Sequence, residues 1–251
     1  MTEDLFPYQK VRFIAKTEPR PDLIAGAGFD HGKMTAPTAS DLIAYCARVS
    51  NPANQDKFDT AGKLLKYLTK NEHWSPFEMA HMVVEVQTTR DIGRQILRHR
   101  SFSFQEFSQR YAEVSEDWFI SVREARLQDT KNRQNSVDTT ESAEDTSTKS
   151  LFKNDQEEHI SDCIGKYRSA LENGIAKEQA RCFLPEGLTM SRMYMSGTVR
   201  SWIHYCMVRE TTGITQKEHV DIARKCRKIL VAEFPSLKDL FDAKSDVTQK
   251  E

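Results

Sequence analysis

The sequence contains no apolar run that approaches the roughly 18 residues of a membrane-spanning helix. Its first ten residues, MTEDLFPYQK, are polar and acidic, and they lack the charged and then apolar layout of a secretion signal. These two absences predict a cytoplasmic protein that has no membrane partner.

Cysteine and metal-binding motifs are also sparse. The five cysteines are widely spaced and odd in number, and no CxxC pair occurs, which argues against a disulfide framework and against a zinc knuckle. The chain has no HExxH segment and its seven histidines are scattered, so we expect no metal site.

A surplus of positive charge is missing too. The chain has 36 Lys and Arg residues against 37 Asp and Glu residues, which gives a formal net charge of −1. Proteins that bind nucleic acids draw much of their affinity from neutralising phosphates and are usually basic. The balance therefore predicts no nucleic-acid partner.

Periodic apolar residues predict a mixed fold. Apolar positions recur at helical spacing in 40–49, 56–70, 90–99, 152–172, 199–208 and 216–233. Short or alternating apolar patterns predict strands from Val11 to Ala15 and from Glu78 to Thr89. Because helices outnumber strands, we expect a mixed α/β fold, a helix-rich single domain of residues 1–251 around a modest sheet.

One segment departs from this periodicity. Residues 128–150 are almost wholly polar and rich in Ser, Thr, Asp and Asn. A segment with so few apolar residues has little surface to bury against a core. We expect a mobile insertion inside the domain rather than a linker between two domains, because related chemistry lies on both sides of it.

Residues 95–111 concentrate the groups that bind anions. Arg98, Arg100 and Arg110 stand there among serines, amides and a glutamate. Arginine binds phosphate with two parallel hydrogen bonds and keeps its charge at every physiological pH. Glu106 can accept a hydrogen bond from a ring N–H or a ribose hydroxyl. The alternative is a basic helix end followed by a polar loop that has no ligand.

The order of these residues closely resembles the signature RHRxxSxxExSxR of flavin-dependent thymidylate synthases. With Tyr111 added, eight positions agree, and chance agreement over the chain is on the order of 10⁻⁸ or less. Other segments resemble the family as well, and the likeness covers about residues 40–235. These segments are ARVS at 47–50, HWSPFE at 73–78, RCFLP at 181–185 and VRSWIHYCMVR at 199–209.

The resemblance implies an enzyme that methylates dUMP to dTMP. Its carbon donor would be methylenetetrahydrofolate, its hydride source FADH2, and its reductant for FAD would be NADPH. It also implies a homotetramer that binds FAD and dUMP between subunits. The uracil would be polarised near N3 by Arg209, the implied catalytic residue, with no nucleophile from the enzyme.

The resemblance also implies the binding residues. For dUMP they are Gln95, Arg98, Glu106, Phe107, Ser108, Gln109, Arg110, Arg181 and Arg209. For FAD they are Ser50, His73, Ser75, Arg98, His99, Arg100, Glu106, Thr198, Arg200 and His204.

Structural explanations compete with several of these roles. His204 lies on an amphipathic helix, where a buried and satisfied histidine is common. Ser108 has no Ser-His-Asp order around it and is assigned to binding. Cys182 lies in an apolar helical pattern, so we expect a buried thiol there and not a nucleophile.

Two other functions stay open at this point. The first is a nucleic-acid binder that uses the arginine cluster, and the second is a family member that binds flavin without synthase activity. Bound flavin separates the first from an enzyme, and an assay separates the second.

Overall fold

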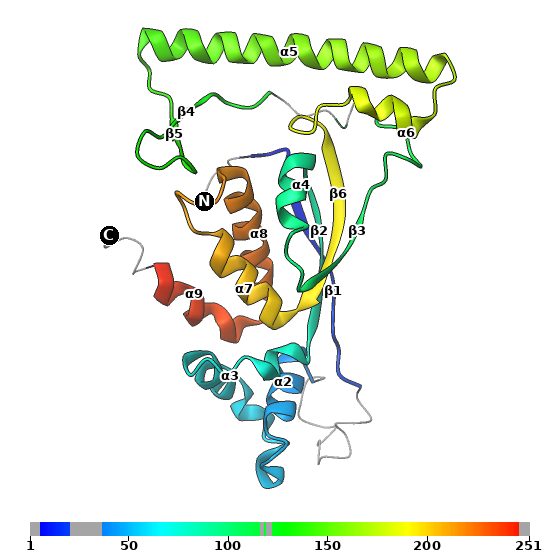
Figure 1. Cartoon of the computed structure of the whole chain (residues 1–251). Coiled ribbons are helices and arrows are strands. Elements are labelled where there is room, and N and C mark those ends of the chain that lie inside the picture. The colour runs from blue at the N-terminus through cyan, green and yellow to red at the C-terminus, as the bar shows by residue number, and fades with distance from the viewer. Residues whose placement is uncertain (1–5, 21–36, 116–117, 119–121, 246–251) are drawn as a thin grey trace.

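An antiparallel sheet forms the centre of the computed structural model, which describes residues 6–20, 37–115, 118 and 122–245 (Figure 1). Its four strands lie in the order β1-β2-β6-β3. They span Lys10–Lys16 (β1), His81–Thr89 (β2), Met190–Thr198 (β6) and Phe102–Glu106 (β3). Met82, Val84 and Val86 of β2 face the core as their alternation predicts, and all three are fully buried.

Three helices cover one face of this sheet, α4 (Arg90–Ile96), α7 (Val199–Arg209) and α8 (Lys217–Glu233) (Figure 1). Two of them begin where a strand ends: α4 directly follows β2, and α7 directly follows β6. Thr198 closes the start of α7, because its hydroxyl accepts from the Ser201 amide at 3.1 Å. Trp202 donates from Nε1 to the Met82 carbonyl at 3.0 Å and so fixes α7 on the sheet.

Two short helices, α2 (Ala39–Ala47) and α3 (Ala61–Lys70), lie at one end of the sheet, with a 3-10 turn at Ser75–Glu78 (Figure 1). The sequence places the cap of α2 at Ser40, whereas the structure uses Thr38. Thr38 and Asp41 each bind the other's backbone N–H, a reciprocal pair that Ser40 does not form. After α8 the chain forms a 3-10 turn at Pro235–Leu237 and the last described helix, α9 (Lys238–Ser245).

A long helix, α5 (Ala143–Glu172), crosses the other end of the molecule (Figure 1). Before it comes a small hairpin of β4 (Arg126–Gln128) and β5 (Ser136–Asp138), and after it a short helix, α6 (Lys177–Ala180). Gly174, at φ 78°, follows the end of α5.

The polar segment 128–150 therefore carries regular structure. The sequence predicts a helix start near Phe152, but α5 begins at Ala143. Ser142 caps it by accepting from the Asp145 amide, and two acidic residues occupy its first turn. Capping thus extends the helix N-terminally beyond its apolar stripe. The mobility of residues 128–150 stays a prediction.

The expected mixed α/β class, with helices around a modest sheet, is confirmed. Among the described helices, none combines the length and the apolar character that crossing a membrane requires.

Candidate functional site

The motif segment connects two distant ends of the sheet. Residues 95–111 run from the end of α4 through a turn into β3 and then into a loop. Phe102 pairs with Gly197 near the start of α7, whereas Glu106 pairs with Met193 further along β6. Because a strand rises about 3.3 Å per residue, His99 and Arg110 of the motif lie far apart in one chain.

Arg209 contacts His99 near the middle of this arrangement. The Arg209 Nε donates to the His99 Nε2 at 2.8 Å. Burial, and then the nearby Arg209 charge, lowers the pKa of His99 to about 4. At neutral pH His99 is therefore uncharged and carries its proton on Nδ1. The contact uses only the Nε of Arg209 and leaves both terminal amino groups of the guanidinium for a ligand.

A second histidine, His219 of α8, lies beside this pair and is fully buried. Its Nε2 is 3.1 Å from the Tyr205 hydroxyl, and its Nδ1 is 3.2 Å from the Gln95 Oε1. The Gln95 Nε2 in turn donates to the Gln216 Oε1 at 2.8 Å. Burial, and then the Arg209 charge, lowers the pKa of His219 to about 3. No sequence pattern singles out His219 or Tyr205, because both lie in ordinary helical stripes.

Glu106 has partners from its own chain. Ser191 donates to its Oε1 at 2.8 Å, and Arg90 and Arg94 each approach the carboxylate to 3.8 Å. Glu186, which the sequence did not single out, pairs with the same two arginines at 3.3 and 3.8 Å. Glu106 is therefore held in place as a carboxylate at the end of β3.

Beyond β3, two arginines predicted to bind dUMP meet at one glutamate. The Arg110 Nε is 3.3 Å from the Glu178 carboxylate, and the Arg181 Nε donates to the Glu178 carbonyl at 3.2 Å. The Ser108 hydroxyl accepts from the Arg110 amide at 3.3 Å. Two converging guanidinium groups suit a doubly charged phosphate.

Gln109 and Phe107 lie inward at the same loop. Only 4% of Gln109 is exposed, and its Nε2 has no hydrogen-bond partner in the described part of the chain. Phe107 packs on Trp118 with ring centroids 4.2 Å apart. A buried amide donor without a partner is costly, so Gln109 is suited to a ligand or to another subunit.

The predicted flavin residues gather at the opposite end of the sheet, around the start of α7. A pocket of about 520 Å³ lies there, and its lining includes Trp74, Ser101, Arg200 and His204. Arg200 pairs with Glu78 of the Ser75–Glu78 turn. The Thr198 hydroxyl serves as the helix cap, and His204 is exposed at the pocket instead of buried in the core.

Apart from the partly buried His99 and Glu106, the remaining flavin candidates lie on the surface. His73 is exposed and edge-on to Tyr67, with ring centroids 6.4 Å apart, and Ser50 is exposed just after α2. Arg98 and Arg100 are exposed as well and form no ion pair within the described residues. Free arginines at the surface are suited to an anionic ligand.

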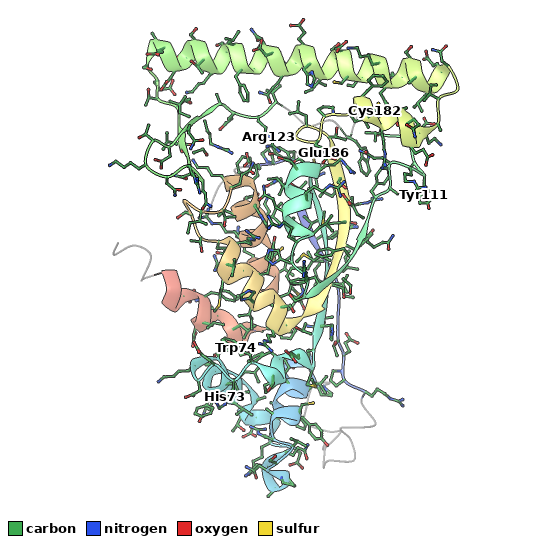
Figure 2. All side chains as sticks on the ribbon, viewed as in Figure 1. His73, Trp74, Tyr111, Arg123, Cys182 and Glu186 are labelled. Carbon is green, nitrogen blue, oxygen red and sulfur yellow. The ribbon has the colours of Figure 1, made fainter. Side chains whose placement is uncertain are left out.

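One chain does not bring all these residues into a single cavity. In Figure 2, His73 and Trp74 lie at the end of the molecule that holds α2 and α3, while Tyr111, Cys182 and Glu186 lie near α5. Arg209 of α7 and Gln95 of α4 belong to helices between the two ends, and His99 lies in the turn that follows α4 (Figure 1).

Comparisons with known proteins identify the family. The family model described as thymidylate synthase complementing protein matches residues 33–236. A relative from Paramecium bursaria Chlorella virus 1, named "Probable flavin-dependent thymidylate synthase", is 51% identical over 205 residues, 82% of this chain and 91% of its own. The flavin-dependent thymidylate synthase of Synechocystis is 47% identical over 227 residues, 90% and 96% of the two chains. The chain belongs to the flavin-dependent thymidylate synthase family.

A solved structure agrees with this assignment at the level of the fold. The UMP/dUMP methylase PolB from Streptomyces cacaoi superposes with a TM-score of 0.72 and covers 94% of each chain at 22% identity. The mixed α/β arrangement is thus the fold of a solved protein, and the resemblance noted in the sequence is confirmed.

No group of three or more His, Cys, Asp or Glu side chains is placed to hold a metal ion in the described part of this thymidylate synthase family member. A partly buried His–Cys contact, Cys163 with His159 at 3.6 Å, has no third ligand among the described residues.

The two neutral histidines predict how stability depends on pH. Folding lowers the pKa of His99 from 6.5 to about 4 and that of His219 from 6.5 to about 3. Below pH 6.5 the unfolded chain therefore binds protons that the folded chain does not, so the free energy of unfolding should fall as the pH falls.

Urea unfolding at pH 7.0 and 5.5 measures this loss of unfolding free energy. The loss should be smaller in His219→Gln, which cannot titrate, and unchanged in the control His81→Gln, which alters an exposed strand residue. An equal loss in wild type and His219→Gln would contradict the assignment.

Proposed function

We propose that this family member is a thymidylate synthase that methylates dUMP at uracil C5. It takes the carbon from methylenetetrahydrofolate, and NADPH re-reduces its flavin. The observation that carries the proposal is the Arg209–His99 contact at 2.8 Å, which orients a guanidinium and keeps its terminal amino groups for a ligand. Family membership supports the reaction class.

The phosphate of dUMP binds at Arg110 and Arg181. Arg110 is paired with the Glu178 carboxylate, which a phosphate can replace, and the Arg181 guanidinium lies on the backbone carbonyl of the same residue. The Ser108 hydroxyl, the free amide of Gln109 and the stacked ring of Phe107 complete the nucleotide site. Gln95 donates to the pyrimidine or ribose, Glu106 holds the nucleotide next to Ser108, and Arg98 holds it at the other end of the motif.

Arg209 stabilises charge that develops on the uracil. Bond formation at C5 requires an electron-rich ring, and a guanidinium on the N3 and carbonyl side stabilises the negative charge of the enolate-like form that attacks through C5. A preorganised guanidinium costs no reorientation at that moment. His99 holds Arg209 in place as a neutral acceptor, and it adds no second positive charge that would repel the guanidinium.

The residues at the start of α7 fit a flavin dinucleotide. Arg200 and the positive end of the helix dipole at the start of an 11-residue helix suit its phosphates, and His204, Ser101 and Trp74 line the pocket beside them. The pocket of about 520 Å³ holds only part of a dinucleotide. Reduced flavin, when bound, supplies the hydride that turns the transferred methylene into a methyl group. His73, Ser75, Ser50 and Arg100 are placed to hold the rest of the cofactor.

Copies of the chain complete the site as a homotetramer. The proposed flavin and phosphate groups lie at opposite ends of β3 in one chain, and the buried Gln109 amide lacks a partner there. A site shared between subunits brings the phosphate end of one chain to the flavin end of another. The same assembly covers exposed arginines such as Arg98.

Four of the five cysteines lack the features of a nucleophile. Burial raises the thiol pKa of Cys46, Cys163, Cys206 and Cys226 and so disfavours the reactive thiolate. Cys182 was expected to be buried, and that prediction was wrong: its side chain is exposed on the short turn that follows α6. The apolar pattern around it belongs to Leu184 and Ala180, which face the core instead.

The exposure of Cys182 makes its removal informative. We expect Cys182→Ala to keep dTMP formation within about three-fold of wild type, whereas loss of an obligatory nucleophile costs many orders of magnitude. A Cys182→Ala protein that binds FAD and dUMP but forms no dTMP would overturn the mechanism.

Ser108→Ala should weaken dUMP binding by about 1–2 kcal/mol, the cost of one hydrogen bond to a charged or polar partner.

The proposed function is tested by the purified protein itself. A yellow protein whose flavin absorbance changes on addition of dUMP, and which forms dTMP from dUMP with methylenetetrahydrofolate and NADPH, fits the proposal. A colourless protein that binds nucleic acid would favour a nucleic-acid binder. A yellow protein that binds dUMP and forms no dTMP would favour a member without synthase activity.

A further inference from the structure

A buried chain of hydrogen bonds ends at a residue of the proposed nucleotide site. It joins Tyr205, His219, Gln95 and Gln216 over distances of 3.1, 3.2 and 2.8 Å. Tyr205 and His219 are fully buried, so neither can exchange a partner with water. Each link in the chain thus constrains the next.

The donor-to-acceptor direction of these hydrogen bonds decides which way the Gln95 amide faces. A histidine can present either ring nitrogen as the donor, and a glutamine amide can exchange its oxygen and nitrogen with little change in shape. The links allow two consistent arrangements. In the first Tyr205 donates, His219 Nδ1 donates to the Gln95 Oε1, and the Gln95 Nε2 donates to Gln216. In the second every donor and acceptor is reversed.

Tyr205 selects the first arrangement. In the second arrangement His219 would donate to the Tyr205 oxygen. The buried hydroxyl hydrogen would then have no acceptor, because His219 is its hydrogen-bond partner among the described residues. A buried donor without an acceptor costs more than an unused lone pair. Burial also keeps the Tyr205 pKa well above its usual value of 10.0, so the hydroxyl stays a donor.

We propose that His219 is a positioning residue for nucleotide binding. Because its Nε2 accepts from the Tyr205 hydroxyl, its Nδ1 donates to the Gln95 oxygen and so fixes the orientation of that amide. The Gln95 oxygen is then occupied by His219, and the second Gln95 N–H faces the nucleotide as a donor to a carbonyl or ribose oxygen. This inference rests on the proposed function, because that function places Gln95 on dUMP.

The same histidine supports the proposed catalytic pair through packing. Tyr205, which it binds, lies edge-on to His99 with ring centroids 4.9 Å apart, and His99 accepts from Arg209. That packing uses the Tyr205 ring, which stays in place when His219 is replaced, so the hydrogen bonds of His219 reach the nucleotide site only through Gln95. Its effect on nucleotide affinity must therefore vanish when the Gln95 amide is removed.

A double-mutant cycle tests this dependence in the holoenzyme. The dUMP dissociation constant is measured by the change in flavin absorbance for wild type, His219→Leu, Gln95→Ala and the double variant, with FAD content and thermal midpoint as fold controls. Leucine fills similar space without either ring nitrogen. We expect His219→Leu to weaken dUMP about ten-fold in wild type and less than two-fold in the Gln95→Ala background.

Two further variants keep the test decisive if His219→Leu does not fold. His219→Gln retains one donor and one acceptor and should bind dUMP within about three-fold of wild type. Tyr205→Phe removes only the hydroxyl that sets the direction, so it should weaken dUMP about three-fold in wild type and not in Gln95→Ala. Equal weakening in both backgrounds, or none in either, would overturn the positioning role. Absence of dUMP binding and of dTMP formation in wild type would instead refute the proposed function.

Discussion

Replacing Arg209 by alanine is expected to lower kcat for dTMP formation by about 10²–10³-fold, the usual loss when one preorganised charge-stabilising group is removed. The dUMP dissociation constant should rise much less, because the charge on the uracil grows only as the reaction proceeds. Steady-state kinetics together with flavin-absorbance titration separate the two quantities.

Two variants act as controls for Arg209. Arg209→Lys keeps the charge and loses the fork that binds His99 through Nε, so it should recover only part of kcat. Arg133→Ala removes an exposed arginine at the tip of the β4–β5 hairpin and should leave both quantities unchanged. Equal losses in kcat and in dUMP affinity for Arg209→Ala would mean that Arg209 serves binding alone.

Removal of Arg110 should weaken dUMP by roughly 10–100-fold, the range for a hydrogen bond to a charged group. The affinity for deoxyuridine, which lacks the phosphate, should not change. The ratio of the two dissociation constants therefore reports the phosphate contact directly, and competition against dUMP binding measures both.

Glu178 supplies a control in the opposite direction. Its carboxylate lies 3.3 Å from the Arg110 Nε and must be displaced by the phosphate. Glu178→Gln removes that competing charge and should tighten dUMP by about two- to three-fold, since both partners are half exposed and such pairs are weak. If Arg110→Ala weakened deoxyuridine as much as dUMP, the phosphate would bind elsewhere.

The helices and the central strand could be predicted because their apolar residues are periodic. β2 with buried Met82, Val84 and Val86, α7 and α8 all lie where the sequence places them, within a few residues. β3 was missed because its residues belong to the motif, whose polar side chains were interpreted as a loop. β6 was missed because its alternation includes arginine, serine and threonine on the uncovered face of the sheet.

Candidate site residues could be predicted only where the residue type itself indicates the chemistry. Arg209, Arg110 and Arg181 are arginines in a recognisable order, and the family resemblance names them. Glu178 and His219 act through position: Glu178 pairs with Arg110, and His219 lies inside a helical stripe. Such contacts join residues distant in sequence, and neither periodicity nor spacing reports them.

The oxidation state of the folate product tests the proposed chemistry most directly. The methylene carbon must gain a hydride to become the methyl group of dTMP. If reduced flavin supplies that hydride, a single turnover of the reduced enzyme under anaerobic conditions should yield one tetrahydrofolate and one oxidised flavin for each dTMP, with no dihydrofolate. Chromatography of the quenched folates, beside the flavin absorbance, gives all three amounts. Dihydrofolate formed in step with dTMP, while the flavin stays reduced, would show that the folate itself was the hydride donor and would contradict the proposed function.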